Sequence, residues 1–268
     1  MYSFFDIHSH FNLESFDADL EASCKLLKER NIGTICVGVD EKSSQRALDI
    51  SQKYDNVFAC IGVHPQEAHQ KEYFDTQYFD KLVESSQVVA VGECGLDYFR
   101  IDPNDSVGKN HQKKIFTEQI MYAAQHKLPL MLHIRPSFNT YDAYYEVLEI
   151  LEESKKQFPN LKGNAHFFVG TKEIAQRFIG LGFTVSFTGV ITITDEYDEV
   201  VRSTPLESMM AETDAPFVAP KPYRGKRCEP WMVEEVYIKI ARLKNISVEE
   251  LVRIFEKNRT HMFFDPES

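Results

Sequence analysis

The stretch Val88–Glu93 reads VVAVGE. Its first four residues are small or β-branched and apolar, which is typical of a β-strand. A glycine ends the run, and an acidic side chain follows at once. Because an unpaired charge is costly to bury, Glu93 marks the end of this strand as a candidate functional position. The same pattern recurs along the chain and decides the fold.

Eight short β-rich segments alternate with stretches whose apolar residues are spaced as on a helix. The β-rich segments are Ser3–His8, Gly33–Val39, Val57–Val63, Val88–Gly92, Leu128–His133, Lys162–His166, Phe183–Phe187 and Leu206–Thr213. Helical spacing is seen in Phe16, Leu20, Cys24 and Leu27, in Phe116, Ile120 and Ala123, and in Val233, Val236, Ile240 and Leu243. This alternation predicts parallel strands joined by crossover helices.

A last helix is predicted after Ser247. Glu250 follows three residues later, as in a capping box, and Leu251, Ile254 and Phe255 then lie on one face. No internal repeat, low-complexity tract or flexible linker interrupts the pattern. The chain is therefore expected to form one domain over residues 1–268.

Two folds fit the alternation of strands and helices. An open doubly wound sheet should show one nucleotide-binding crevice rather than reactive residues after many strands. In a (β/α)8 barrel, by contrast, the carboxyl ends of all strands face one common site. Reactive residues follow many of the strands here, so we predict an α/β fold: a single (β/α)8 TIM-type barrel, with distortion allowed, and an extra C-terminal helix.

Six side chains of ligand type end or directly follow β-rich runs. They are His8, His10, Glu93, His133, His166 and Asp214. Taken singly, each has an ordinary explanation, such as a helix cap, a salt bridge or a hydrogen-bonded core histidine. His8 and His10 lie two apart in an extended segment, so their side chains point to the same side and can converge on one ion. Together, at the shared end of a barrel, the six predict a metal centre.

Four histidines and two carboxylates are more than one tetrahedral ion requires. We therefore predict two divalent ions per chain, with a carboxylate between them. Glu93, from the middle of the chain, is the natural bridge. Imidazole-rich coordination suits Zn²⁺, Mn²⁺ or another transition ion better than Mg²⁺, which prefers oxygen ligands.

Two residues near these positions are candidates for substrate contact. His64 follows the third β-rich segment, where it could face the substrate or be a surface loop histidine. Arg135 lies two residues after His133, on the same side of the strand. Its planar guanidinium could hold a phosphate oxygen or form an ordinary salt bridge.

A basic segment, KPYRGKR at residues 221–227, follows the last strand of an otherwise acidic chain. At the rim of the barrel, Arg224, Lys226 and Arg227 could hold phosphates, or they could form a solvated basic loop. The formal net charge of −11 disfavours nonspecific coating of nucleic acid. It does not exclude a local site, because metal ions can supply positive charge where a phosphodiester binds.

Composition points to a protein without a membrane segment. With 43% hydrophobic residues in 268, the chain can bury one large core. It has no basic start followed by an apolar stretch and no apolar run long enough for a span, so we expect a soluble, cytoplasmic protein with no obligate protein partner. The five cysteines are odd in number and scattered, which favours small core residues over disulfides. They are Cys24, Cys36, Cys60, Cys94 and Cys228.

Several motifs in one order resemble the TatD family of metal-dependent deoxyribonucleases, within the amidohydrolase-like barrels. The resemblance covers almost the whole chain. It rests on DIHSH at Asp6–His10, GVHP at Gly62–Pro65, GECGLDY at Gly92–Tyr98, LPLMLHIR at Leu128–Arg135, HFFVG at His166–Gly170, SFTG at Ser186–Gly189, ETDAP at Glu212–Pro216 and YRGKRCEP at Tyr223–Pro230. Small departures from the family pattern occur at Cys94, Phe167 and Cys228.

The resemblance implies a division of the ligands between two ions, of Mg²⁺, Mn²⁺ or Zn²⁺. One ion is held by His8, His10, Glu93 and Asp214, and the second by Glu93, His133 and His166. His64 resembles the histidine that lies near the scissile phosphate. Catalytic roles are thus expected for Asp214, which would accept a proton from water, and for His64 and Glu93.

The resemblance also implies an activity: hydrolysis of DNA phosphodiester bonds, of 3′–5′ exonuclease type on single-stranded ends. A D-aminoacyl-tRNA deacylase or another metal-dependent esterase is the alternative, because acyl and phosphoryl transfer need overlapping machinery. A dihydroorotase-like amidohydrolase is disfavoured, since its bridging group is commonly a carboxylated lysine and here it is Glu93. A noncatalytic nucleic-acid-binding module is the weakest alternative for so acidic a chain.

Overall fold

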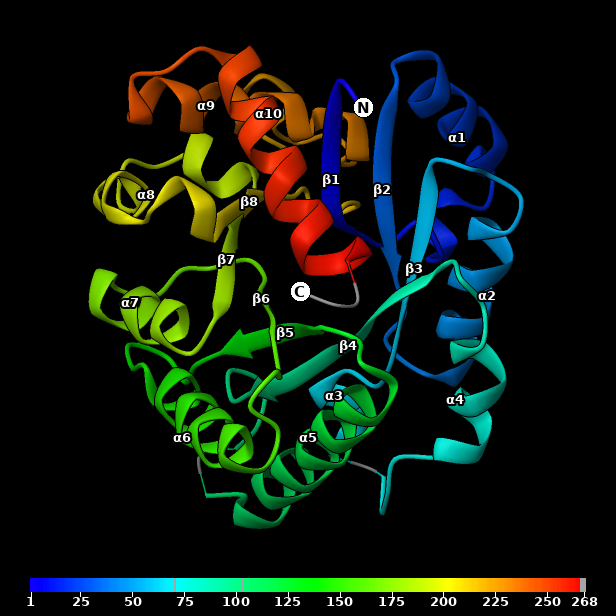
Figure 1. The fold of residues 1–268 in the computed structure, drawn as a ribbon, viewed down its shortest axis with the longest axis vertical. Coiled ribbons are helices and arrows are strands. Elements are labelled where there is room, and N and C mark those ends of the chain that lie inside the picture. Colours follow the sequence, from blue (N-terminus) through cyan, green and yellow to red (C-terminus); the bar gives the residue numbers. More distant parts are fainter. Residues whose placement is uncertain (70, 103, 266–268) are drawn as a thin grey trace.

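Eight parallel strands hydrogen-bond in sequential order from β1 to β8 in the computed structural model, which describes residues 1–69, 71–102 and 104–265. They are β1 Phe4–Ser9, β2 Ile32–Val37, β3 Val57–Ile61, β4 Val88–Asp97, β5 Leu130–Arg135, β6 Gly163–Ala165, β7 Phe183–Phe187 and β8 Met209–Ala211. Figure 1 shows them surrounding the centre of the molecule, with helices outside. This confirms the predicted (β/α)8 barrel.

Helices connect successive strands along the outside of the barrel, and two more, α9 and α10, follow the last strand (Figure 1). They are α1 Leu20–Glu29, α2 Glu41–Ser51, α3 Pro65–Ala68, α4 Thr76–Val83, α5 Ser106–His126, α6 Asp142–Gln157, α7 Lys172–Gly180, α8 Asp198–Ser203, α9 Val233–Lys244 and α10 Val248–Arg259. Helix α10 is the predicted extra C-terminal helix. Its N-cap is Ser247, whose hydroxyl accepts a hydrogen bond from the Glu250 N–H at 3.1 Å.

The barrel closes between β1 and the segment that follows β8. The backbone N–H of Asp214 donates to the His8 carbonyl at 2.9 Å, and the N–H of His10 donates to the Ala215 carbonyl at 2.7 Å. The buried Asp6 carboxylate adds a side-chain tie, because it accepts from both the N–H and the hydroxyl of Thr213. These contacts bring the two ends of the barrel's strand order together beside the predicted ligands.

The amino-terminal end of the barrel is plugged by the C-terminal part of the chain. A π-helical turn, Thr260–Phe264, follows α10, and its Met262 and Phe263 join a core cluster with Phe5 and other residues inside the barrel. The Arg259 guanidinium lies 4.4 Å from the Phe5 ring centre. The open end of the barrel is therefore the one at the carboxyl ends of the strands, where barrels of this type place their site.

Two strand predictions need correction. The segment Leu206–Thr213 is not one strand, because Leu206–Ser208 form a 3₁₀ turn and β8 covers only three residues. Strand β4 does not end before Glu93 but runs on to Asp97. The pairing of β4 with β5 shifts register between Gly92 and Cys94, so Glu93 lies in a β-bulge. In a bulge one residue is left out of the regular pairing, here Glu93, and the pairing of the two strands continues after it.

The remaining composition-based expectations concern membranes and cysteines. Among the residues that the structure describes, no helix has the length and apolar character needed to cross a membrane. All five cysteines are buried and unpaired, as predicted.

Candidate metal centre

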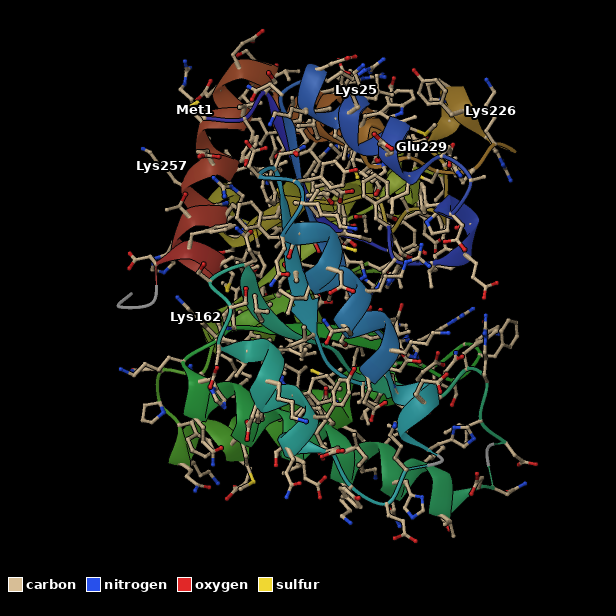
Figure 2. All side chains as sticks on the ribbon, turned by 90° about the vertical axis from the view of Figure 1, so that its right-hand side faces the viewer. Met1, Lys25, Lys162, Lys226, Glu229 and Lys257 are labelled. Carbon is tan, nitrogen blue, oxygen red and sulfur yellow. The ribbon has the colours of Figure 1, made fainter. Side chains whose placement is uncertain are left out.

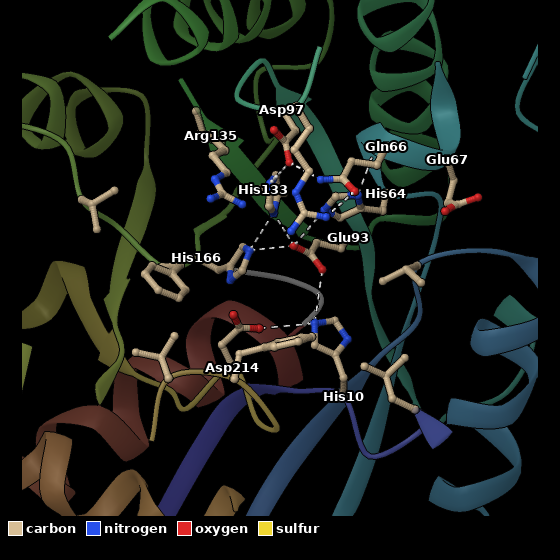
Figure 3. Close-up of a pocket in the computed structure, with 18 residues that line it drawn as sticks. His10, His64, Gln66, Glu67, Glu93, Asp97, His133, Arg135, His166 and Asp214 are labelled. Atoms are coloured by element: carbon tan, nitrogen blue, oxygen red, sulfur yellow. Dashed lines mark hydrogen bonds and ion pairs between the residues drawn. The ribbon is translucent and has the colours of Figure 1, made fainter. Parts of the chain in front are cut away.

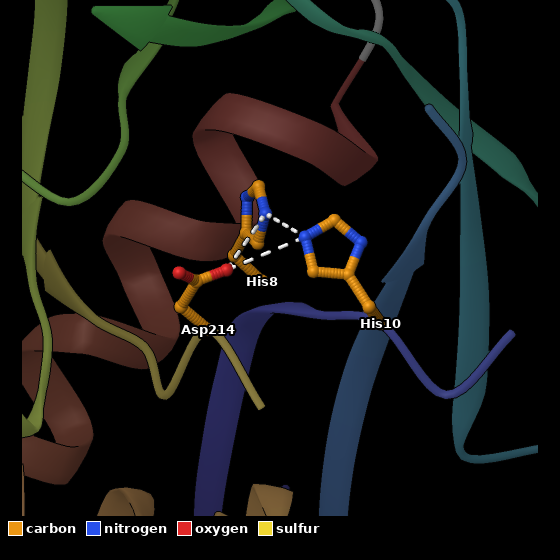
Figure 4. A group of neighbouring side chains, drawn as sticks. All are labelled: His8, His10 and Asp214. Carbon is orange, nitrogen blue, oxygen red and sulfur yellow. Dashed lines mark hydrogen bonds and ion pairs between the residues drawn. The ribbon is translucent and has the colours of Figure 1, made fainter. Parts of the chain in front are cut away.

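All six predicted ligand side chains meet at the carboxyl ends of the strands. Figure 3 shows five of them around one cavity of about 520 Å³. Figure 4 shows the sixth, His8, beside His10 and Asp214. Side chains that are up to 206 positions apart in the sequence thus form one cluster, as the barrel fold predicts.

The first group of donors has the spacing of a tetrahedral site. His8 Nε2 and His10 Nε2 are 3.2 Å apart, and Asp214 Oδ1 lies 3.6 and 3.3 Å from them (Figure 4). Glu93 Oε2 lies 3.6 and 3.4 Å from the same two nitrogens. Four donors that bind one ion at about 2.0–2.1 Å are separated by about 3.3–3.4 Å. These five distances are therefore close to those around a single divalent ion, and His8, His10 and Asp214 form a group that could hold one.

Backbone conformation and a hydrogen bond orient two side chains of this first group, Asp214 and His10. Asp214 has φ of 56°, in the left-handed region that Asp tolerates better than most residues. The Nδ1 atom of His10 lies 2.9 Å from the Val37 carbonyl, to which it donates when Nε2 is deprotonated. That hydrogen bond leaves the Nε2 lone pair facing the other donors, as a metal ligand requires.

Glu93 connects two groups of donors. While Oε2 faces His8 and His10, its other oxygen, Oε1, lies 2.6 Å from His133 Nδ1 and 2.7 Å from His166 Nε2 (Figure 3). The Glu93 carboxylate can reach both groups because the backbone of the preceding residue, Gly92, lies close to β5, with φ of 153°. A Cβ at that position would lie only 2.4 Å from the Met131 carbonyl oxygen.

The second group of donors is drawn together by hydrogen bonds. His133 Nδ1 and His166 Nε2 are 3.4 Å apart, which suits two ligands of one ion. Their distances to Glu93 Oε1, however, are those of charge-assisted hydrogen bonds. In this arrangement each histidine can donate an N–H to Glu93 Oε1. A cation held by these three side chains would take the place of those protons.

Two carboxylates that we did not predict lie behind the second group. Asp97 Oδ2 is 3.3 Å from His133 Nε2, and Glu212 Oε2 is 3.2 Å from His166 Nδ1. Ligating histidines commonly donate their second N–H to such a carboxylate. The only available sequence signal was an acidic residue within a buried β-rich run, which by itself does not reveal its partner.

Electrostatics in the cluster follow from this crowding of opposite charges. Burial would lower the pKa of His166, but the carboxylates of Glu93 and Glu212 raise it well above its ordinary value. Burial would likewise lower the pKa values of His133 and His10, yet neighbouring carboxylates raise both. Burial would raise the pKa of Glu93, but the histidines around it, His166 first, hold it well below its usual range. The carboxylate of Glu93 is thus kept anionic.

His64 lies in the wall of the cavity rather than on the surface. Its Nδ1 accepts a hydrogen bond from the Gln66 N–H at 3.0 Å, so its proton is on Nε2, 3.7 Å from Glu93 Oε1. Burial first, and then the charge of His133, lowers the pKa of His64 to about 3. The neutral ring therefore presents an N–H donor to the cavity.

Two arginines line the same cavity. Arg135, predicted from the sequence, stacks over the Phe99 ring at 4.0 Å and lies beside His133 in Figure 3. Arg100 was not predicted, and its guanidinium donates to the Gln66 side chain at 3.2 Å. Both bring positive charge to a cavity whose floor is rich in carboxylates.

The three cations of the basic segment have different surroundings in the structure. Arg224 and Lys226 are exposed, and Lys226 points outward at the edge of the molecule in Figure 2. Arg227 instead pairs with Asp19 and with Glu229, each with an N–O distance of 2.6 Å. It thereby anchors the loop to the start of α1. Among the residues described as lining the cavity, none of the three cations is present.

The comparison with known proteins matches the geometry. A family model described as TatD related DNase matches residues 5–264. The chain belongs to the TatD family. It is 36% identical over 262 residues to the uncharacterized metal-dependent hydrolase YabD of Bacillus subtilis (strain 168), covering 97% of this chain and 98% of that protein.

Two further relatives agree with the TatD assignment. The crystal structure of YjjV, a TatD homolog from Escherichia coli K12, superposes with a TM-score of 0.86 at 26% identity, covering 98% of this chain and 99% of that one. A putative deoxyribonuclease TATDN1 homolog from Vairimorpha ceranae (strain BRL01) is 30% identical over 247 residues, 88% of this chain and 86% of that protein. As a member of the TatD family, the chain is a metal-dependent hydrolase with His, Glu and Asp clusters able to bind metal.

Protons and metal ions should compete for this TatD centre. The pKa values of His10, His133 and His166 are raised, so these rings hold protons to higher pH than free histidine and must lose them before binding an ion. We expect Zn²⁺ affinity to rise steadily from about pH 6 to about pH 8, with at least about one proton released per ion. Calorimetric titration in buffers of different ionisation enthalpy measures both quantities. An affinity that does not change over this range would contradict the assignment.

Proposed function

We propose that the chain is a two-metal phosphodiesterase that hydrolyses DNA from single-stranded ends. The observation that carries this proposal is the position of Glu93, whose two carboxylate oxygens face two different groups of donors. When bound, divalent ions at these positions supply Lewis acidity: they lower the pKa of water and neutralise charge on a phosphate. The fold and the family support such a centre, and the following residue roles extend it.

The proposed ligand sets follow the two groups of donors. His8, His10, Glu93 and Asp214 hold one ion, and Glu93, His133 and His166 hold the other. Four imidazoles favour Zn²⁺ or Mn²⁺ over Mg²⁺ in these sets.

Asp214 is the proposed proton acceptor. Its Oδ1 faces the His8 and His10 nitrogens, while none of the described hydrogen bonds reaches Oδ2. The side chain lines the cavity and keeps 12% of its surface exposed, so Oδ2 is open to a water molecule in the cavity. A carboxylate in this position can orient the attacking water and take its proton.

His64 and Arg135 are the proposed phosphate contacts. His64 is neutral and offers its Nε2–H, and Arg135 offers a charged, planar donor held in place by stacking on Phe99. Hydrogen bonds to the non-bridging oxygens would strengthen as negative charge builds up on the phosphate during attack. Arg100, across the Gln66 side chain, is a second candidate for such a contact.

The choice of DNA rests on the family description and on the Vairimorpha relative's name, together with the cationic groups in the cavity. The test is incubation of Zn²⁺-, Mn²⁺- or Mg²⁺-loaded protein with single-stranded and duplex DNA labelled at either end. We expect shortening of the single strand from its 3′ end, abolished by chelation and restored by added metal. No cleavage with any of the three ions would overturn the proposal. Release of a D-amino acid from intact aminoacyl-tRNA, in the absence of DNA cleavage, would replace it with the deacylase.

The basic segment at residues 221–227 allows a test that separates DNA binding from stability. Replacing Arg224 and Lys226 with Ala should raise KM for DNA and make its logarithmic salt dependence shallower, by about 0.7 for each phosphate that is no longer neutralised, with kcat within about tenfold. Replacing Arg227 should instead lower Tm by roughly 2–4 °C, because the pairs with Asp19 and Glu229 are removed. Thermal melts and steady-state kinetics at several salt concentrations check both. An unchanged salt slope in the double variant would show that these two cations do not touch DNA.

A further inference from the structure

The Glu212 carboxylate is completely enclosed, with no exposed side-chain surface. It follows β8 directly and lies behind the proposed metal centre, outside the proposed ligand sets. A buried carboxylate is costly unless its oxygens are hydrogen-bonded, so its partners indicate what it does.

The two oxygens of Glu212 have different partners. Oε1 accepts a hydrogen bond from the Phe167 backbone N–H at 2.7 Å and another from the Ser186 hydroxyl at 2.5 Å. Oε2 lies 3.2 Å from His166 Nδ1. One oxygen is therefore held by the protein framework, and the other faces a proposed ligand.

Neither donor to Oε1 can readily be reversed. The Ser186 hydroxyl oxygen already accepts from the Asn164 side-chain amide at 2.7 Å, which leaves its own hydrogen for Glu212. The Phe167 N–H is a backbone group and can only donate. Phe167 has φ of 46°, a strained conformation for a bulky residue, and it is directly bonded to His166. The framework thus requires an acceptor at the Oε1 position.

We propose that Glu212 is a positioning residue that keeps the ring proton of His166 on Nδ1 and so leaves Nε2 free to bind the second ion. A neutral imidazole carries one N–H, and an ionised carboxylate can only accept. Nε2 lies 2.7 Å from Glu93 Oε1, where the second group of donors meets. When the Nε2 proton leaves and Nδ1–H stays donated to Oε2, the Nε2 lone pair faces that position and can bind an ion. The inference concerns the metal-dependent centre and holds whatever the substrate is.

The two histidines of the first group, His8 and His10, are arranged differently. His10 points its Nδ1 at the Val37 backbone carbonyl, a neutral acceptor. The His8 ring stacks on the His166 ring at 3.8 Å with only 6° between their planes. Within the described part of the chain its buried Nδ1 has no hydrogen-bond partner. Glu212 thus makes its close ring contact with His166, as Asp97 does with His133. A His8 ring nitrogen lies within 4.8 Å of Glu212 but has no hydrogen bond to it, so we expect the main effect of Glu212 on the second ion.

Glu212→Gln tests the proposal because the framework dictates how the amide must lie. The Gln oxygen has to stay at the Oε1 position to accept from Phe167 and Ser186, so the NH₂ group faces His166 Nδ1. Nδ1 must then accept, which moves the ring proton to Nε2 and blocks metal binding there. Volume and shape are retained, so packing changes little.

The measurements are Zn²⁺ affinity at each position and the ¹⁵N spectrum of the histidine rings in zinc-loaded protein. We expect Glu212→Gln to weaken the second ion about 10–100-fold while the first keeps its affinity. The His166 signals should report a protonated Nδ1 in the wild-type chain and a protonated Nε2 in the variant. A purely structural Glu212 predicts something else: a lower Tm, with both zinc affinities and the wild-type tautomer retained.

Ser186→Ala is the matched control. It removes one hydrogen bond from Oε1 but leaves Oε2 facing His166, so both Zn²⁺ affinities should stay within about threefold of wild type. Equal losses in the two variants would overturn the proposal, as would unchanged zinc binding in Glu212→Gln. If Glu212→Gln does not fold, the wild-type spectrum alone decides, because a zinc-loaded chain with the His166 proton on Nε2 contradicts the proposal. DNA hydrolysis is not a readout here, so failure of this inference is distinguishable from failure of the proposed nuclease.

Discussion

Glu93→Gln is expected to lower kcat at least about a hundredfold and to reduce metal content from two ions per chain to one. The wild-type carboxylate offers one oxygen to each group of donors. The amide has only one oxygen, and its NH₂ group cannot bind a cation. One position must therefore lose its shared ligand. The negative charge that offsets the repulsion between two dications is removed as well.

Metal analysis, melting curves and DNA cleavage on the Glu93→Gln variant measure these effects. Glu84→Gln is the matched control, because Glu84 is an exposed residue at the end of α4, before β4 begins, whereas the proposed ligands lie at the carboxyl ends of the strands. A glutamate that only forms a salt bridge would lose about 1 kcal/mol of stability and leave catalysis nearly intact. Two bound ions together with near wild-type turnover would rule out Glu93 as the bridge.

Asp214→Asn is expected to lower kcat about 10²–10⁴-fold at saturating metal, the usual contribution of a positioned general base. Asn tolerates the left-handed backbone at φ of 56° as well as Asp does, so the fold should be retained. Its amide oxygen can still face His8 and His10, whereas it cannot take a proton from water. The first ion should bind more weakly but remain bound when metal is in excess.

The kinetics of Asp214→Asn should be measured over a range of metal concentrations. A defect that disappears as metal is raised would show that Asp214 is only a ligand and that the proton leaves by another route. A kcat that stays low with the centre fully loaded supports the role as proton acceptor. Comparing the metal affinities of the variant and the wild-type chain separates the two effects.

Much of the fold could be predicted because strand and helix formation depend on local patterns of apolar residues. The expected strand Phe183–Phe187 coincides with β7, and the Ser247 cap starts α10 as predicted. Strand β7 is buried along its whole length and stands out as a short β-rich run, whereas a helix buries one face at the helical period, so a short window of sequence is enough to show either. The meeting of the six ligand-type residues then follows from the barrel, because the strands' carboxyl ends share one face.

Strand ends and bulges were less predictable. Nothing in VVAVGE shows that the strand resumes after Glu93, since the bulge depends on how β4 pairs with β5. The close approach of Gly92 to Met131 is likewise a property of two neighbouring strands. Local propensity describes a segment, whereas register is set by the partner against which it packs.

The partners of charged side chains were decided by the tertiary structure alone. Arg227 looked like a phosphate ligand in the sequence, but the fold places it against Asp19, 208 residues away. Glu212 and Asp97 were not predicted as site residues, and it is the barrel that puts each behind a histidine. A charged side chain can pair with any opposite charge that comes within a few ångströms. The strength of that interaction depends on how deeply the pair is buried. Those distances exist only once the chain has closed β1 onto the segment after β8, so the sequence indicates which residues can do chemistry and the fold decides which of them act together.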